Sequence, residues 1–143
     1  MAITQLSVFL ENKPGRLAEA VRLLSEAKVN LRALSIADTK DFGIMRIIAS
    51  ETERAKEALH DYAIVTETPV VAVKMDDEAG ALYHVLRVLE RAQINVEYLY
   101  AFTAQSAPSA YVVLRVDDAE HAESVLKQNG VSTLSDAQLA KLL

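Results

Sequence analysis

The sequence predicts an α+β protein of two ferredoxin-like βαββαβ repeats with antiparallel sheets, plus a short C-terminal helix. Two observations predict this fold: an internal repeat, and the same order of strand-like and helix-like patterns in each copy. Identical residues recur 65 positions apart, from 15 to 80. The matching pairs are Gly15 and Gly80, Leu17 and Leu82, Leu24 and Leu89, Asn30 and Asn95, and Leu34 and Leu99. Self-similarity at a fixed offset is typical of a duplicated unit.

Farther along the chain the offset becomes 67 residues, since Ala55 matches Ala122 and Leu59 matches Leu126. The second copy therefore carries two extra residues. We expect them in residues 105–108, where proline and small polar side chains indicate a loop.

The first copy combines period-two and helical patterns. Leu6, Val8 and Leu10 alternate as in a strand, and Leu17 and Leu24 share one helical face. The polar turn 38–41 separates two strands, and Ser50 or Thr52 is expected to cap the second helix. The predicted order is strand Ile3–Leu10, helix Pro14–Lys28, strand Val29–Ala37, strand Gly43–Ser50, helix Glu51–Asp61 and strand Tyr62–Glu67.

The second copy repeats this order. Asp117 and Asp118 suit a helix start, and Gly130 suits a helix end. Ser135 and Asp136 begin the terminal helix. The predicted elements are strand Val70–Met75, helix Ala79–Gln93, strand Ile94–Ala104, strand Ser109–Val116, helix Asp117–Asn129 and strand Val131–Leu134.

Thr68-Pro69 is the predicted boundary between the copies, because proline lacks the N–H that a sheet ladder needs. The expected domains are therefore residues 1–68 and 69–143.

Composition excludes several classes of function. The net charge is −5 and the pI is near 5.2, which argues against a nucleic-acid partner. The chain has no cysteine, so it has no disulfide and no thiolate site. It has no apolar run of the roughly 20 residues that a membrane helix needs. No signal peptide is visible, so we expect a cytoplasmic protein without a membrane partner.

The chain also lacks the motifs of common catalytic sites. His60, His84 and His121 lie on three different predicted helices, and none belongs to a recognised metal motif. There is no Walker loop, nucleophile elbow or Gly-rich dinucleotide turn. We therefore expect neither a metal nor a cofactor, and no enzymatic activity.

The strand–turn–helix segment from Leu10 to Leu17 is the main candidate site. Pro14 suits the first helical position, and Gly15 allows a ligand to approach the backbone. The free N–H groups at a helix start, with the positive end of the helix dipole, suit a carboxylate. An asparagine side chain offers both a donor and an acceptor to an amino-acid zwitterion.

These residues resemble the ACT domain, a small regulatory module that binds amino acids. The resemblance covers nearly the whole chain as two tandem copies. Its most specific part is Glu11–Leu17, which reads ENKPGRL, followed by VNL at residues 29–31. This pattern is similar to the regulatory domain of phosphoglycerate dehydrogenase.

The resemblance implies a ligand held against the strand–helix loop at an interface between domains. In the family, the residues that match Asn12 and Asn30 hydrogen-bond the amino acid, and the glycine that matches Gly15 meets it through the backbone. This chain has Leu10 where the dehydrogenase has a histidine. The expected ligand-binding residues are Leu10, Asn12, Lys13, Pro14, Gly15, Arg16, Leu17, Asn30, Asp76, Asp77, Gly80 and Asn95.

Some of these residues have a second interpretation. Asp77 matches Asn12 in the repeat, and it suits either helix capping or neutralisation of the ligand ammonium, a role that Asp76 also suits. Asn30 and Asn95 suit either ligand binding or a left-handed turn.

The aromatic residues of the second copy are a further case. Tyr98, Tyr100 and Phe102 share one strand face, either as the lining of a pocket or dimer surface or as ordinary packing. The alternate positions are then expected to point inward; they are Leu34, Ile36, Leu99 and Ala101.

Two non-catalytic functions follow from the resemblance. The first is a stand-alone amino-acid-binding regulatory protein that forms a homodimer, since open sheet edges need cover. The second is a separate regulatory subunit of an amino-acid biosynthetic enzyme such as acetolactate synthase. A small enzyme on this fold is a third hypothesis, against which the lack of a clustered acid, base or nucleophile weighs.

Overall fold

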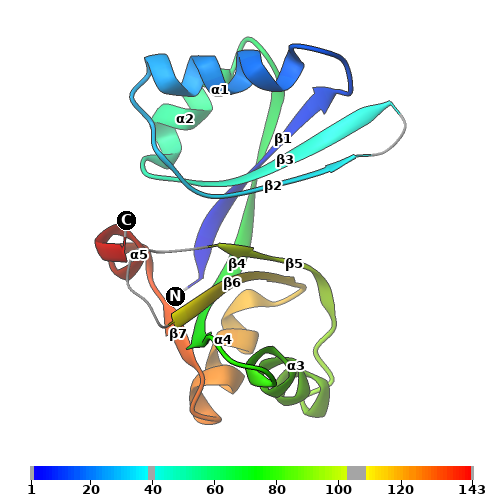
Figure 1. The fold of residues 1–143 in the computed structure, drawn as a ribbon, viewed down its shortest axis with the longest axis vertical. Coiled ribbons are helices and arrows are strands. Elements are labelled where there is room, and N and C mark those ends of the chain that lie inside the picture. The colour runs from blue at the N-terminus through cyan, green and yellow to red at the C-terminus, as the bar shows by residue number, and fades with distance from the viewer. Residues whose placement is uncertain (1, 39–40, 103–108, 143) are drawn as a thin grey trace. The chain divides into compact units, whose positions relative to one another are not determined.

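The computed structural model describes residues 2–38, 41–102 and 109–142 (Figure 1). The chain divides into two compact units. The N-terminal unit is Thr4–Thr68, and the C-terminal unit is Pro69–Leu143 together with Met1–Ile3. The predicted loop insertion at residues 105–108 and residues 39–40 of the predicted turn lie outside the described residues.

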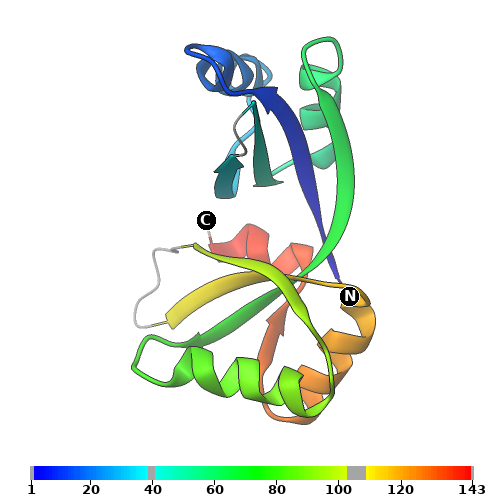
Figure 2. The same ribbon diagram turned by 90° about the vertical axis from the view of Figure 1, so that its right-hand side faces the viewer.

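The N-terminal unit has two helices on one face of an antiparallel sheet, as Figures 1 and 2 show. Its sheet order is β2-β3-β1-β4, with β1 and β2 both antiparallel to β3. Apolar residues of β1 and β3, such as Val8 and Met45, pack with Leu24 and Leu59 of the helices. The elements are β1 (Ile3–Glu11), α1 (Arg16–Glu26), β2 (Leu31–Asp38), β3 (Phe42–Ala49), α2 (Thr52–Leu59) and the first part of β4 (Ile64–Asp76).

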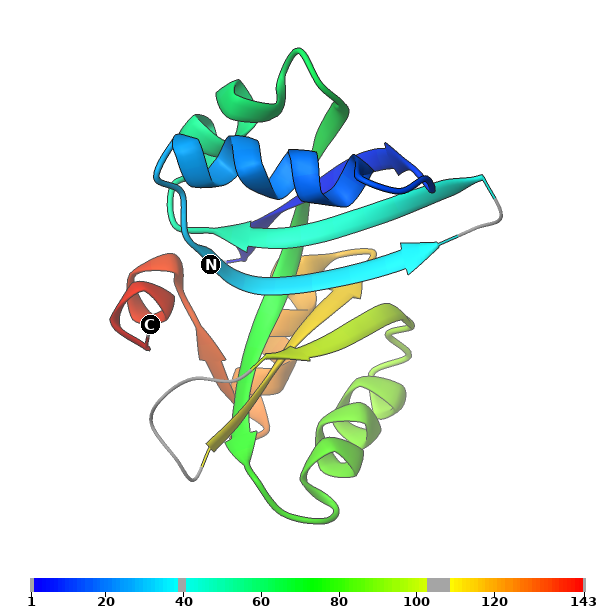
Figure 3. The same ribbon diagram turned by 45° about the horizontal axis from the view of Figure 1, so that its top comes forward.

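The C-terminal unit repeats this plan, with the order β7-β4-β6-β5 and antiparallel pairing throughout. Val73 and Leu114 of the sheet pack with Leu89 and Leu126 of its two covering helices, which Figure 3 shows on one side of the sheet. The elements are the rest of β4, α3 (Ala81–Arg91), β5 (Val96–Phe102), β6 (Ser109–Val116), α4 (Ala119–Gln128), β7 (Ser132–Leu134) and α5 (Asp136–Leu142). The predicted α+β fold of two βαββαβ units with a terminal helix is therefore confirmed.

The boundary segment differs from the prediction. Thr68 and Pro69 lie inside one continuous strand, β4, and do not interrupt it. The fixed φ of proline is compatible with extended backbone. The ladder from β4 to β6 begins only at Val71, so proline removes no hydrogen bond from it. The domain ranges 1–68 and 69–143 stay predictions.

Both first helices begin later than predicted. Helix α1 starts at Arg16, so the assignment of Pro14 to the first helical position is wrong. Gly15 adopts a left-handed φ of +83°, and Gly80 adopts +92° before α3, so a right-handed helix begins only after each glycine. The predicted caps Ser50 and Thr52 are also wrong, because Glu51 occupies the N-cap of α2 without a side-chain bond.

Other predicted helix boundaries are confirmed. Asp118 caps α4 by accepting a hydrogen bond from the His121 N–H at 3.1 Å. Ser135 and Gln138 form reciprocal side-chain to backbone bonds at the start of α5.

The ends of α1 and α3 explain a second correction. Lys28 and Gln93 both have φ of +59°, so they, and not Asn30 and Asn95, hold the left-handed positions. Helix α1 ends at Glu26. Beyond it, the Val29 N–H donates to the Leu24 carbonyl at 3.0 Å. This is a Schellman arrangement, and it brings the chain back toward the sheet.

The expected inward positions on the edge strands are wrong. Leu34 is 45% exposed, Ile36 is 47% exposed and Leu99 is 37% exposed. Tyr100 and Phe102 are instead buried, and the Phe102 ring stacks on Tyr111 with centroids 5.2 Å apart. Strands β2 and β5 are the last in their sheets, so their side chains on the helical face extend beyond the cover of the helices.

We predict that Gln93→Gly stabilises the C-terminal unit by about 0.5–1 kcal/mol. The variant removes the cost of a left-handed non-glycine residue, about 1–2 kcal/mol, but glycine loses more backbone entropy on folding, which offsets part of the gain. Urea unfolding followed by circular dichroism measures the change. The control Ser124→Gly, in the middle of α4, should lose about 0.5 kcal/mol. Equal losses from both variants would contradict the strain at Gln93.

Candidate functional site

The corner between β1 and α1 is an exposed turn closed by backbone hydrogen bonds. The Asn12 N–H donates to the Asp41 carbonyl at 3.1 Å, and the Lys13 N–H donates to the Glu11 carbonyl at 2.9 Å. The Arg16 N–H then bonds to the Lys13 carbonyl at 3.3 Å. This geometry holds residues 11–17 at the surface and leaves the side chain of Asn12 exposed.

The start of α1 presents backbone donors to solvent. The first bond of helical spacing runs from the Glu19 N–H to the Gly15 carbonyl at 3.0 Å. The N–H groups of Leu17 and Ala18 precede that bond, and no side chain caps this helix. A ligand carboxylate at this corner would meet two donors and the positive end of a helix dipole.

Charges beside the corner are already paired. Glu11 Oε2 lies 3.1 Å from Lys13 Nζ, and Glu11 Oε1 lies 3.5 Å from Arg16 Nη2. The hydrogen bond from Lys13, helped by the charges of Lys13 and Arg16, holds the pKa of Glu11 below its ordinary value. The two cations leave the corner weakly positive around a paired carboxylate, which favours an anionic group.

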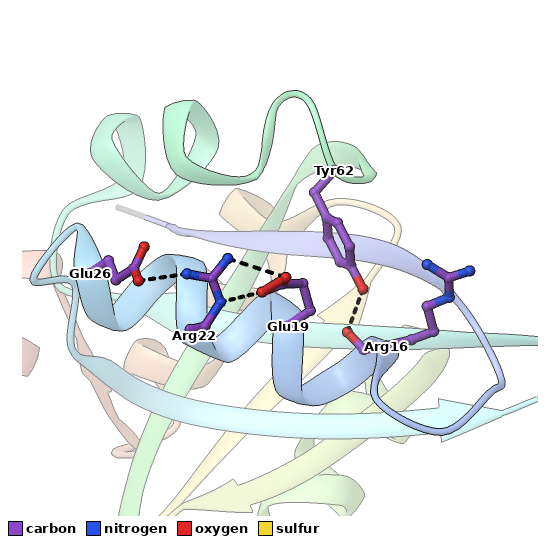
Figure 4. A network of polar contacts seen from close by, with 5 residues as sticks. All are labelled: Arg16, Glu19, Arg22, Glu26 and Tyr62. Carbon is purple, nitrogen blue, oxygen red and sulfur yellow. Dashed lines mark hydrogen bonds and ion pairs between the residues drawn. The ribbon is translucent and has the colours of Figure 1, made fainter.

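The exposed face of α1 forms a separate ion-pair network, drawn in Figure 4. Arg22 pairs with Glu19 and Glu26, and these hydrogen bonds raise the pKa of Arg22. In the same view, the Tyr62 hydroxyl donates to the Arg16 carbonyl at 2.8 Å, which ties the end of α2 to the first turn of α1.

Asn12 and Asn30 do not meet within the N-terminal unit. They flank opposite ends of α1, whose 11 residues span about 16 Å. Asn30 lies in a surface hollow of about 280 Å³ with Val21 and Lys28. Asn30 also fixes its own backbone, because its N–H donates to Ser50 Oγ at 3.0 Å.

The C-terminal unit separates its residues in the same way. Asn95 lies in a hollow with Leu86 and Gln93, the repeat equivalents of Val21 and Lys28. Gly80 and Asn95 flank opposite ends of the 11-residue α3. One unit alone therefore cannot bring its loop glycine and its strand-opening asparagine to a single small ligand.

The second corner borders a cavity of about 480 Å³ within the C-terminal unit. Asp76 and Gly80 line it, as predicted residues, whereas Asp77 is not part of its lining. The sequence did not predict four further polar lining residues, which are Lys74, Glu78, His84 and Ser132. His84 was detectable as the residue one turn after Gly80, but Lys74 and Ser132 meet only through the pairing of β4 with β7.

Leu10 and Leu17 have different environments. Leu10 is 7% exposed and belongs to the core of the N-terminal unit, so it anchors the start of the corner in that core. Leu17 is 39% exposed on α1. Lys13, Pro14 and Arg16 are exposed in the turn itself.

The sequence profile of the ACT domain pair matches residues 1–143, and the chain therefore belongs to the ACT domain pair family. ACT domains are regulatory modules, and no catalytic family is indicated. None of the curated proteins compared with the sequence matches it significantly.

Solved structures share the fold. The crystal structure of protein BT0572 from Bacteroides thetaiotaomicron is 40% identical, with a TM-score of 0.92 over 99% of this chain and 98% of that chain. The regulatory subunit of aspartate kinase from Thermus thermophilus is 15% identical, with a TM-score of 0.64 over 90% of this chain and 93% of that chain. The corresponding subunit from Thermus flavus is 16% identical, with a TM-score of 0.62 over 90% and 92% of the two chains.

Among residues 2–38, 41–102 and 109–142, no group of three or more His, Cys, Asp or Glu side chains is arranged to hold a metal ion. In the same part of the chain, every helix is too short or too polar to span a membrane.

We predict that Lys13→Ala raises the pKa of Glu11 toward its ordinary value, because the hydrogen bond from Lys13 is the main cause of the lowered pKa and the variant removes it. The lowered pKa means that the interaction stabilises the corner above the ordinary pKa of Glu and is lost as the pH falls through the lowered value. NMR titration of the Glu side-chain carboxyls measures the change. Lys127→Ala, in the C-terminal unit, is the control; an unchanged pKa of Glu11 in Lys13→Ala would contradict the pairing.

Proposed function

We propose that this protein is a non-catalytic regulatory protein that binds a small amino acid at the strand–helix corners, at an interface between domains. The observation that supports this most directly is the left-handed glycine at both corners, Gly15 and Gly80, each followed by uncapped helix N–H groups. Membership of the ACT domain pair family supports a regulatory ligand-binding role.

The proposed contacts follow from the two ends of an amino acid. The carboxylate accepts hydrogen bonds from the backbone at Gly15 and Leu17, within the frame of Lys13, Pro14 and Arg16 over the buried Leu10. The side chain of Asn12 holds the ammonium or the carboxylate from the same corner.

The second domain completes the proposed site. Asn30 of one domain approaches the corner of another, since the two asparagines flank opposite ends of α1. Gly80 and Asn95 repeat this arrangement in the C-terminal unit, where Asp76 or Asp77 neutralises the ammonium.

A homodimer would supply this second domain. Exposed apolar side chains follow α1 and the edge strand β2: Leu17 is 39% exposed, Leu34 is 45% exposed and Ile36 is 47% exposed. Their repeat equivalents Leu82 and Leu99 are both 37% exposed. Burial of this apolar strip, with the open edge of β2, favours association of two domains side by side.

The alternative is a separate regulatory subunit of an amino-acid biosynthetic enzyme such as acetolactate synthase. The whole-chain likeness of fold to proteins described as regulatory subunits of aspartate kinase supports this possibility. Co-purification with a biosynthetic enzyme from its own organism favours the subunit, and a stable dimer without such an enzyme favours the stand-alone protein.

We predict that at least one common amino acid raises the melting temperature of the chain. At a concentration of 100 times Kd, binding adds about 2.7 kcal/mol, or about 5–15 °C for a chain of this size. Thermal-shift measurements should show that the variants Asn12→Ala and Asn30→Ala each lose most of this rise in melting temperature. Glu57→Ala, on the exposed face of α2, is the control that should keep it.

No rise with any amino acid, for a folded wild-type chain, would refute the binding role. A rise that survives both asparagine substitutions would refute these two contacts.

A further inference from the structure

One of the places at which the two units differ is the link from the second helix to the last strand. In the N-terminal unit, Tyr62 follows α2, and its hydroxyl donates to the Arg16 carbonyl at 2.8 Å (Figure 4). The tyrosine side chain therefore extends across the end of the unit to the first turn of α1. Tyr62 is partly buried and packs against the core of that unit.

The C-terminal unit has no such side chain at the equivalent position. By the offset of 67 residues, from 62 to 129, Tyr62 corresponds to Asn129. Asn129 turns back onto its own helix, where Nδ2 donates to the Val125 carbonyl at 2.8 Å. The next residue, Gly130, has no side chain and lines the cavity of about 480 Å³ beneath the β4–α3 corner.

The cavity has the size and lining of a small-molecule site. Its volume falls in the range of about 300–1,000 Å³ that is usual for ligand pockets. Met75, Val85 and Val131 supply an apolar part, and Val85 and Val131 are themselves buried. Asp76 and His84 are among its polar residues.

The charges of the lining indicate the class of ligand. Two carboxylates, Asp76 and Glu78, outnumber the one lysine, Lys74. An ammonium group is therefore favoured, and a second negative charge on the ligand is not. Leu82 and Tyr83 do not line the cavity, but Ala81 and His84 on either side of them do. The N–H groups of Leu82 and Tyr83 precede the first helical bond, from His84 to Gly80, so the start of α3 beside the cavity carries donors that suit one carboxylate.

We propose that this cavity is a self-contained binding site for a free amino acid with a neutral or cationic side chain, complete within the C-terminal unit, and that Tyr62 closes its counterpart in the N-terminal unit. This inference rests on the proposed function for its ligand class. It differs in needing no second domain, and it adds His84, Val131 and Ser132 to the residues that meet the ligand.

Four glycines make the site directly observable. Gly80 and Gly130 line the cavity, whereas Gly15 and Gly43 lie in the N-terminal unit. A full chain labelled with ¹⁵N only at glycine gives one amide signal for each. Gly43→Ala, Gly80→Asn and Gly130→Asn assign them, since asparagine tolerates the left-handed φ of Gly80 and Gly130.

The experiment titrates this labelled chain with each common free amino acid at millimolar concentration. We expect at least one neutral or cationic amino acid to move the signals of both Gly80 and Gly130. Asn129→Tyr, which restores the tyrosine of the other unit, should weaken that binding at least tenfold. Gln128→Tyr adds the same bulk outside the cavity lining and should leave binding unchanged.

A second filling variant, Ala81→Leu, keeps the test independent of Asn129. Dispersed Gly80 and Gly130 signals report that the C-terminal unit of each variant is folded. A rise in melting temperature with movement of Gly15 alone would overturn this inference and leave the proposed function standing. Wild-type affinity in both filling variants, or a response only to acidic amino acids, would also overturn it. No signal movement and no melting rise with any amino acid would overturn both proposals.

Discussion

The left-handed glycine at the start of each first helix is the constraint on which the candidate site depends. Gly15 and Gly80 have φ of +83° and +92°, and a Cβ added at either position would meet no atom within 4 Å. The requirement is therefore one of backbone conformation and not of space. Most residues with a side chain would strain this turn, and asparagine is the exception because it tolerates a left-handed φ.

The duplication makes each unit a control for the other. Both units keep the glycine corner, the left-handed residue after the first helix and the asparagine that opens the next strand. They diverge where Tyr62 reaches α1 in one unit while Asn129 bonds to its own helix in the other. The two units therefore share the backbone of the corner but differ in the side chains around it, so their two corners are not chemically equivalent.

Much of the fold follows from periodicity, because burial on one face imposes it directly. The alternation of Leu6, Val8 and Leu10 predicted a strand, and the structure contains it as β1. The helical spacing of Leu17 and Leu24 predicted a helix, which is α1. Backbone conformation was harder to predict. Pro14 resembled a helix start, but the φ of Gly15 delays the helix. Pro69 resembled a break, but an extended strand accommodates it.

The candidate site was predictable only where its residues are neighbours along the chain. Asn12 and Gly15 share one turn, and Asp76 and Gly80 share the other. Lys74 and Ser132 come together through strand register, which local patterns do not encode. The exposure of Leu34 depends on β2 being an edge strand, which is a property of the whole sheet.

A crystal structure of the chain with the amino acid that binds most tightly tests the central claim most directly, since it locates the ligand carboxylate. Our account predicts that this carboxylate accepts hydrogen bonds from the backbone N–H groups that follow Gly15 or Gly80, at the usual length of about 2.7–3.2 Å. A ligand bound away from both corners, with those N–H groups in contact only with water, would contradict it.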